Sequence, residues 1–273
     1  MAIGYLIDIE FLWGFQAKIV GLSKTSPSFY YPPPSTFLGS IAEVIAKENF
    51  LGEDEGKKVI PVISERLLAL GVKPLNCIPI KYEDLNRIVT IKITGETGLC
   101  PDPSSLRSSF DSPAFGKTIF STFDQNPPLL RYFLVLRDEL FKINDKVFSV
   151  DEETFWKIHR IGSKESLVSC DEVKRVDVKI LKETAFTTYS FPLTDDVIPI
   201  SEREGRWERE LYIDLFKMGL YSPINYLLSK NLATHMIPIR RYRIAEPEYH
   251  VRFTNNIAAY VNEREVVIGR WLE

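Results

Sequence analysis

The stretch IGYLIDIEFL, residues 3–12, places large apolar side chains at every second position. This period of two is typical of a β-strand. The stretch YPPPSTFLG, residues 31–39, then leads through three prolines into apolar residues at helical spacing. We expect a helix that has Ser35 as its N-cap residue and ends near Asn49, because serine is a favoured N-cap residue.

The same two periodicities predict the other elements of the chain. They are a second helix over residues 52–71, a short helix over 151–159, and strands over 77–82, 87–94, 129–137 and 173–182. Residues 95–128 interrupt this series, since they are rich in Gly, Pro and Ser and carry isolated phenylalanines. Loops longer than about 12–15 residues are uncommon unless they are functional or disordered. We therefore interpret residues 95–128 as an insertion in a hairpin.

Without the insertion and the extra helix, residues 3–182 follow the order strand, helix, strand, strand, helix, strand. This βαββαβ order is that of a ferredoxin-like fold. We predict an α+β protein with a ferredoxin-like domain in residues 1–190 and a smaller β-rich region in residues 191–273.

The charge balance excludes some classes of protein. The 273 residues include 34 Lys and Arg against 37 Asp and Glu, which gives a formal net charge of −3, and 45% are hydrophobic. A mostly disordered chain is excluded, because disorder needs few apolar residues and a large net charge. The balance argues against a generic nucleic-acid coat protein, whose affinity comes from many phosphate contacts. It leaves room for a local basic groove.

The cysteines and the N-terminus indicate a cytoplasmic protein. Three widely spaced cysteines without a CxxC pair argue against a disulfide scaffold or a zinc site and fit a reducing cytosol. Asp8 and Glu10 interrupt the first apolar run, which argues against a signal peptide. The apolar runs are too short to span a membrane, so we expect no membrane partner.

Motifs for catalysis are weak. Residues 111–118 end in Gly-Lys-Thr like a Walker A loop, but Asp111 stands where the first glycine belongs. The chain lacks the GxSxG, HExxH and GxGxxG patterns, and its three histidines are too far apart for metal-ligand spacing. We expect no cofactor, no metal and no catalytic residue.

Three segments combine small, hydroxyl-bearing, aromatic or basic residues in patterns that suit nucleic acid. The helix start at residues 28–40 could hold a phosphate on its N–H groups, although a rigid turn explains it as well. The loop at 159–166 suits a phosphate contact, or is a solvated helix end. The insertion interleaves aromatics with cations, as single-strand binders do, or is a packed hairpin arm. Residues 240–243 are a fourth, short basic patch.

Together these residues resemble the Cas-five family, the RAMP-type subunit at the crRNA 5′ end of type I CRISPR Cascade complexes. The first strand followed by YPPPSTFLG carries most of the resemblance, and RIGSKESLV, residues 160–168, resembles the archaeal type I-A or the related type I-D form. The resemblance covers essentially the whole chain and is weakest from about Phe191. It implies a RAMP core, a β-hairpin thumb at about residues 95–128 and a smaller C-terminal β region.

The resemblance also implies a non-catalytic subunit that holds the crRNA 5′ handle and contacts the Cas-seven backbone subunits and the Cascade large subunit. Tyr31 and Phe110 are expected to stack on bases. The expected RNA-binding residues are Gln16, Lys18, Lys24, Tyr31 and Ser35 near the first strand and helix, Arg107, Ser108, Ser109, Phe110 and Lys117 on the insertion, and Arg160, Ser163 and Lys164 beyond the second core helix.

Two alternatives stay open. One is a metal-independent precursor-crRNA endoribonuclease, as in the type I-C branch of the family, with Tyr30, Tyr31 or His159 as the proton carrier. The other is a structural adaptor that binds only proteins. RNA binding requires that the basic residues of the insertion, the helix start and the Gly162 loop converge on one face.

Overall fold

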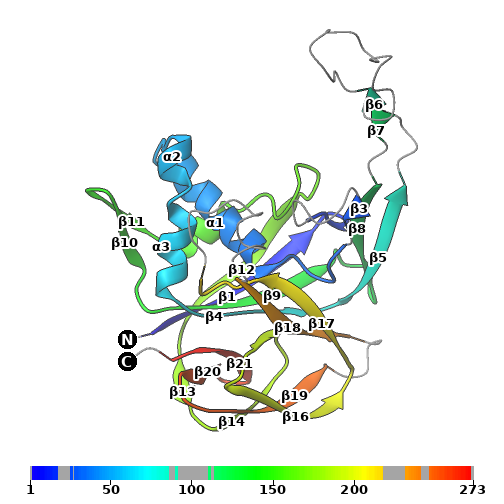
Figure 1. The fold of residues 1–273 in the computed structure, drawn as a ribbon, viewed down its shortest axis with the longest axis vertical. Helices are drawn as coiled ribbons and strands as arrows, with labels where there is room; N and C mark the ends of the chain where they lie inside the picture. The colour runs from blue at the N-terminus through cyan, green and yellow to red at the C-terminus, as the bar shows by residue number, and fades with distance from the viewer. Residues whose placement is uncertain are drawn as a thin grey trace.

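A computed structural model describes residues 2–17, 25–26, 28–85, 90–91, 110–111, 114–217, 231–240 and 246–271. The chain is an α+β protein rich in strands (Figure 1), which confirms the predicted class at that level. The helices among the described residues are α1 (Pro34–Glu48), α2 (Glu53–Gly56), α3 (Val59–Arg66) and α5 (Glu152–Trp156). Among the described residues, no helix has the length and apolarity to cross a membrane.

A four-stranded antiparallel sheet in the order β12-β1-β9-β4 lies at the centre. Its strands are β12 (Val168–Asp177), β1 (Ile3–Phe11), β9 (Leu129–Leu136) and β4 (Leu67–Pro74). β1 and β9 confirm the strands predicted at 3–12 and 129–137. The helix predicted over 52–71 is wrong beyond Arg66, since β4 begins there and is buried at all eight positions. A short apolar run fits a buried strand as well as a buried helix, so its periodicity could not decide.

Both faces of the central sheet are covered. On one face α1 buries its apolar side, and the ring of Phe37 stacks 4.1 Å from that of Tyr132 on β9. On the other face Phe133 and Val135 cluster with Tyr189 and with residues near the C-terminus. Figure 1 shows the helices above the sheet and the C-terminal strands below it. The sheet is therefore the middle layer of three.

A hairpin arm extends from this body (Figure 1). It is formed by β5 (Cys77–Leu85) and β8 (Ala114–Thr122), and β6 (Thr90–Ile91) pairs with β7 (Phe110–Asp111) beyond them. The insertion thus starts at Cys77 and not at residue 95. The run at 77–82, expected as a core strand, pairs with β8 of the arm, because β4 occupies the edge of the central sheet. Residues 92–109 lie outside the described residues.

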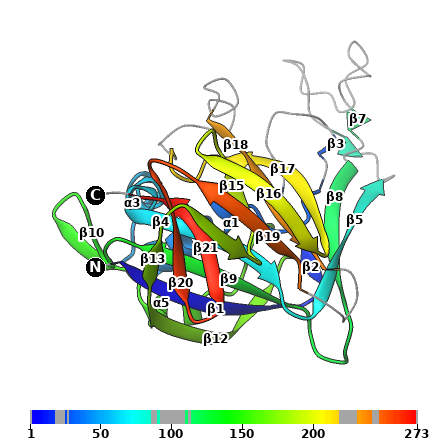
Figure 2. The same ribbon diagram turned by 90° about the horizontal axis from the view of Figure 1, so that it is seen from below.

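The C-terminal strands form three small sheets in the orders β13-β20-β21, β14-β19-β16 and β15-β18-β17 (Figure 2). They are β13 (Lys179–Leu181), β14 (Thr184–Thr187), β15 (Phe191–Leu193), β16 (Val197–Glu204), β17 (Arg206–Ile213), β18 (Leu232–Ile239), β19 (Glu248–Phe253), β20 (Ile257–Asn262) and β21 (Glu265–Arg270). β13 and β14, which precede residue 191, already belong to these sheets. A separate hairpin consists of β10 (Leu140–Ile143) and β11 (Lys146–Ser149).

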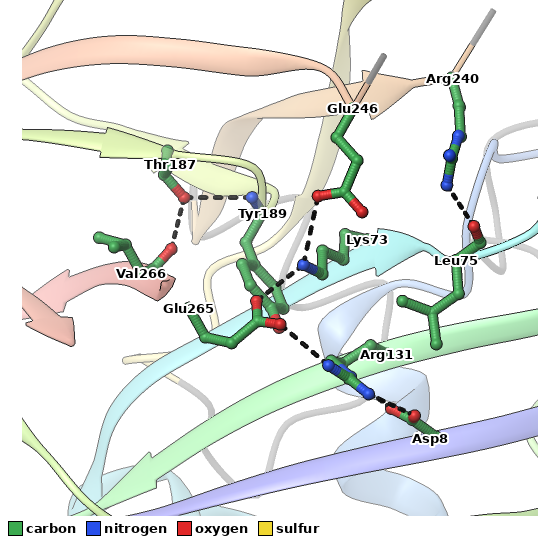
Figure 3. Close-up of polar contacts among 10 residues, drawn as sticks. All are labelled: Asp8, Lys73, Leu75, Arg131, Thr187, Tyr189, Arg240, Glu246, Glu265 and Val266. Atoms are coloured by element: carbon green, nitrogen blue, oxygen red, sulfur yellow. Dashed lines mark hydrogen bonds and ion pairs between the residues drawn. The ribbon is translucent and has the colours of Figure 1, made fainter. Parts of the chain in front are cut away.

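Charged side chains connect the central sheet to the C-terminal strands (Figure 3). Arg131 donates two hydrogen bonds of 2.6 Å to the Asp8 carboxylate, and its Nη1 lies 2.9 Å from Glu265 of β21. Glu265 also pairs with Lys73 of β4 at 2.7 Å. Burial opposes the ionisation of Glu265, but Lys73, Tyr189 and Arg131 together hold the pKa of that carboxyl below its usual value. Glu265 is therefore ionised at neutral pH.

Candidate nucleic-acid interface

A short segment after β1, residues 13–17, joins the base of the arm to the loop that contains Gly162. On one side its strand β2 (Gly14–Phe15) pairs with β8. On the other side the Ser163 N–H donates to the Gln16 carbonyl at 2.9 Å, and the Gln16 N–H donates to Ser166 Oγ at 2.9 Å. Two segments predicted separately, after the first strand and in the Gly162 loop, are therefore in direct contact.

The backbone of the Gly162 loop requires glycine. Gly162 has φ +116°, and an added Cβ would lie 2.6 Å from the Gln16 carbonyl oxygen. The turn is closed by the Ile161 N–H, which donates to the Ser166 carbonyl at 3.1 Å. Gly162 does not cap the preceding helix, because α5 already ends at Trp156. The glycine instead lets the loop approach residues 13–17.

A groove of about 460 Å³ lies between α1 and the Gly162 loop. It is lined by Thr36, Gly39, Ser40, Glu43, Arg160 and Gly162. Apart from its chain neighbours and the nearby backbone of α1, no described atom lies within 4 Å of the position that a Cβ of Gly39 would take, so this glycine leaves the groove open. Small residues of the first turns of α1 thus share one groove with the basic loop.

The charge of this groove is balanced. Arg160 Nη2 lies 2.6 Å from the Glu43 carboxylate, and Lys47 Nζ lies 2.7 Å from it. Partial burial opposes the ionisation of Glu43, but hydrogen bonds from Lys47 and Arg160 hold the pKa of its carboxyl below the usual value. A phosphate at Arg160 would therefore meet a cation that already has a carboxylate partner.

Comparison with known proteins identifies the family of the chain. No protein-family model matches it, and the search of curated proteins gave no match. Among solved structures it is similar to a CRISPR protein from Archaeoglobus fulgidus. The two are 44% identical over 99% of this chain and 100% of that chain, with a TM-score of 0.75. This chain belongs to the CRISPR-associated proteins.

The start of α1 in this CRISPR-associated protein differs from the prediction. The N-cap residue is Pro33 and not Ser35, which lies in the first turn without a capping hydrogen bond. Prolines have no N–H, and the N–H groups of Thr36 and Phe37 donate to the Pro33 carbonyl. The helix start therefore offers few free N–H groups to a phosphate, and a ligand would depend on side chains.

The stacking role expected for Tyr31 does not fit its position in the CRISPR-associated protein. The ring is fully buried, and its hydroxyl donates to the Pro238 carbonyl at 2.8 Å. A buried ring presents no face to a base, so Tyr31 belongs to the core. The Pro-rich sequence around it gave no sign of this burial.

The remaining expected residues are placed as follows. Lys164 is exposed on the Gly162 loop, and Lys117 lies on β8 opposite Tyr82. The backbone of Phe110 lies in β7. Lys18, Lys24, Arg107, Ser108 and Ser109 lie outside the described residues, so their RNA contacts stay predictions.

Sequence reasoning missed a second polar cluster of the CRISPR-associated protein, at the base of the arm. Glu210 of β17 is nearly buried and accepts hydrogen bonds from the Tyr30 N–H at 3.0 Å, Lys81 at 3.0 Å and the Tyr212 hydroxyl at 2.6 Å. Burial raises the pKa of Glu210 although these donors oppose the rise. No local pattern links these residues, which are far apart in sequence. In the described part of the chain, no cluster of His, Cys, Asp and Glu could hold a metal ion.

Proposed function

We propose that this CRISPR-associated protein is a non-catalytic subunit of a type I Cascade complex that binds the 5′ handle of the crRNA. One observation carries the proposal: the groove between α1 and the Gly162 loop adjoins residues 13–17, which pair with the arm. Three segments with side chains suited to phosphates are thus contiguous. The relationship to a CRISPR protein supports a role in such a complex.

The topology supports a ferredoxin-like RAMP core and membership of the Cas-five family. In chain order, β1, α1, β4, β9, α5 and β12 follow the βαββαβ pattern. The antiparallel order β12-β1-β9-β4 places the first and third core strands in the middle. The arm enters between the second and third core strands, which is where we infer the thumb.

We also propose that the protein contacts the Cas-seven backbone subunits and the Cascade large subunit. Exposed apolar side chains on the arm support this proposal. Ile80 and Ile119 lie opposite each other on β5 and β8 and are 50% and 41% exposed. Tyr82, two residues along the same strand, is 44% exposed. Contiguous exposed apolar side chains mark interaction sites more often than isolated ones do.

RNA that co-purifies with the tagged full-length protein tests the proposal. We expect a shared short 5′ sequence followed by variable spacers. Random RNA or none would contradict crRNA binding and favour a protein-only adaptor. In a second arm, the purified chain is incubated with precursor repeat RNA in chelator. A single cut at the handle boundary would show that the protein is an endoribonuclease. Tyr30 or His159 would then have to be the proton carrier.

Substitutions at Gly39 separate folding from binding. A Cβ at Gly39 meets no neighbouring side chain, and both Glu and Gln have a higher helix propensity than Gly. Gly39→Gln should therefore raise the free energy of unfolding by about 0.5 kcal/mol, and Gly39→Glu by less, because its carboxylate lies four residues before Glu43. Gly39→Glu adds a negative charge to the groove and should weaken RNA binding roughly tenfold at low salt, and Gly39→Gln should weaken it less. Fluorescence anisotropy with a handle RNA gives the affinities. Equal affinity of wild type and Gly39→Glu would exclude this groove as the RNA site.

A further inference from the structure

A second groove, of about 600 Å³, lies at the base of the arm. Its walls come from three parts of the chain: Tyr30 before α1, residues 78–81 of β5, and the paired ends of β17 and β18. Arg206 on β17 lies directly opposite Ile239 on β18, and Arg240 follows. These segments are distant in sequence, so the groove exists only in the folded protein.

Cations and flat apolar side chains share this groove. Lys81, Arg206 and Arg240 line it together with Tyr30, Ile78 and Pro79. Lys81 Nζ lies 3.6 Å from the centroid of the Tyr30 ring, and the Arg240 guanidinium lies 5.3 Å from the centroid of Phe123. Cations beside aromatic and apolar surfaces are what single-stranded nucleic acids contact, with phosphates on the cations and bases or riboses on the apolar walls.

Buried Glu210 holds one of these cations in place. Its carboxylate binds Lys81 and the Tyr30 backbone at once, so the ammonium and the ring keep a fixed relative position. Such preorganisation lowers the ordering cost of binding. The Lys81 side chain remains 35% exposed.

Arg240 has N–H donors without an acceptor among the described residues. Within the described residues, it donates one hydrogen bond, from Nη1 to the Leu75 carbonyl (Figure 3), and its buried Nε finds no acceptor. A guanidinium offers five N–H donors in a planar fork that matches phosphate oxygens. Arg206 is half-exposed and pairs with Glu208 on its own strand. The two arginines border the same groove, so one backbone segment could reach both.

We propose that this groove binds a segment of single-stranded RNA, as a contact separate from the groove at α1 and the Gly162 loop. The inference rests on the proposed function and names a second place where the same RNA is held. Phosphates bind Arg206 and Arg240, and a base or ribose lies on the Tyr30 and Ile78 side.

The proposed RNA site in this groove can be tested by titrating a fluorescein-labelled single-stranded RNA, which has a repeat-derived 5′ end, with the protein at several salt concentrations. Arg206→Gln is the main variant, because Arg206 is half-exposed and its loss leaves the core intact. Arg240→Gln is the second, with its unfolding curve measured in parallel. Arg252→Gln, an exposed cation on β19 of another sheet, is the matched control. We expect each groove variant to bind roughly tenfold more weakly at low salt, with a salt slope lower by about 0.7, and the control to match wild type.

Ultraviolet cross-linking followed by peptide mass spectrometry gives an independent readout, with RNA expected on the peptide that contains Tyr30. If the wild type binds the RNA and both Arg206→Gln and Arg240→Gln keep the wild-type affinity and salt slope, this inference is wrong. The proposed RNA site at α1 and the Gly162 loop would be unaffected by that result. If these variants kept RNA binding but lost a neighbouring subunit in pull-down, the groove would be a protein site and the inference wrong. A wild-type chain that binds no such RNA would overturn this inference and the proposed function together.

Discussion

Arg131→Met should lower the free energy of unfolding by about 3–5 kcal/mol. Arg131 is the cation that binds Asp8, a residue that is only 5% exposed, and it also binds Glu265. A methionine fills similar space, but it leaves the Asp8 carboxylate buried without the cation that compensates its charge. Urea unfolding followed by circular dichroism measures the loss, which appears as a lower midpoint at an unchanged slope.

Two further variants distinguish the effect of breaking the buried network from the effect of removing a cation at the surface. Lys174→Met removes an exposed lysine that lies 2.7 Å from Glu172 on β12, and it should cost at most about 1 kcal/mol. The double variant Asp8→Leu/Arg131→Met should be more stable than Arg131→Met alone, because it no longer buries an unpaired carboxylate. If Arg131→Met were as stable as Lys174→Met, the network would contribute nothing to folding.

The second large effect concerns acid stability and His235. This side chain is fully buried on β18, and burial lowers its pKa from 6.5 to about 3. Neither ring nitrogen has a hydrogen-bond partner among the described residues. Below pH 6.5, His235 therefore binds a proton in the unfolded chain but stays neutral in the folded chain until the pH approaches 3. The free energy of unfolding should fall by about 3 kcal/mol between pH 6.5 and about pH 4 from this group alone, and should be unaffected by it at higher pH.

His235→Phe should remove that part of the pH dependence and keep an aromatic ring 5.1 Å from Tyr212. Stability at pH 7 should stay equal or rise, since two unsatisfied buried nitrogens disappear. Glu210, the cross-strand neighbour, is unchanged, and its raised pKa favours the folded state as pH falls, so it cannot cause the loss. Chemical unfolding at several pH values checks this, with His235→Leu as a smaller replacement. If the free energy of unfolding of His235→Phe fell with decreasing pH as steeply as that of the wild type, His235 would not be the cause of the acid sensitivity.

The sequence was sufficient where the pattern is local. β1 and β9 follow from alternation, and the helix after the prolines follows from its apolar spacing. β4 was missed because a strand buried on both faces has no polar side to show a period. The sequence does not show where the arm starts, since β5 alternates like any strand and only its pairing with β8 reveals that it belongs to the arm.

The candidate site divides in the same way. The Gly162 loop and the start of α1 carried recognisable residues, and the structure places them at one groove. The pairing of Arg160 with Glu43 and the burial of Tyr31 depend on contacts across more than a hundred residues, which no local pattern contains. The groove at the base of the arm left almost no trace in the sequence, apart from a short basic patch that begins at Arg240.

The three-layer arrangement of the body has a consequence for how a ligand can approach. Many small RNA-binding domains lay the nucleic acid across an open β-sheet, where aromatic side chains stack on the bases. Here the central sheet has no open face, since α1 lies on one side and the C-terminal strands lie on the other. Under the proposed function, the RNA strand therefore contacts loops and edges around the body of the protein and not the face of the central sheet.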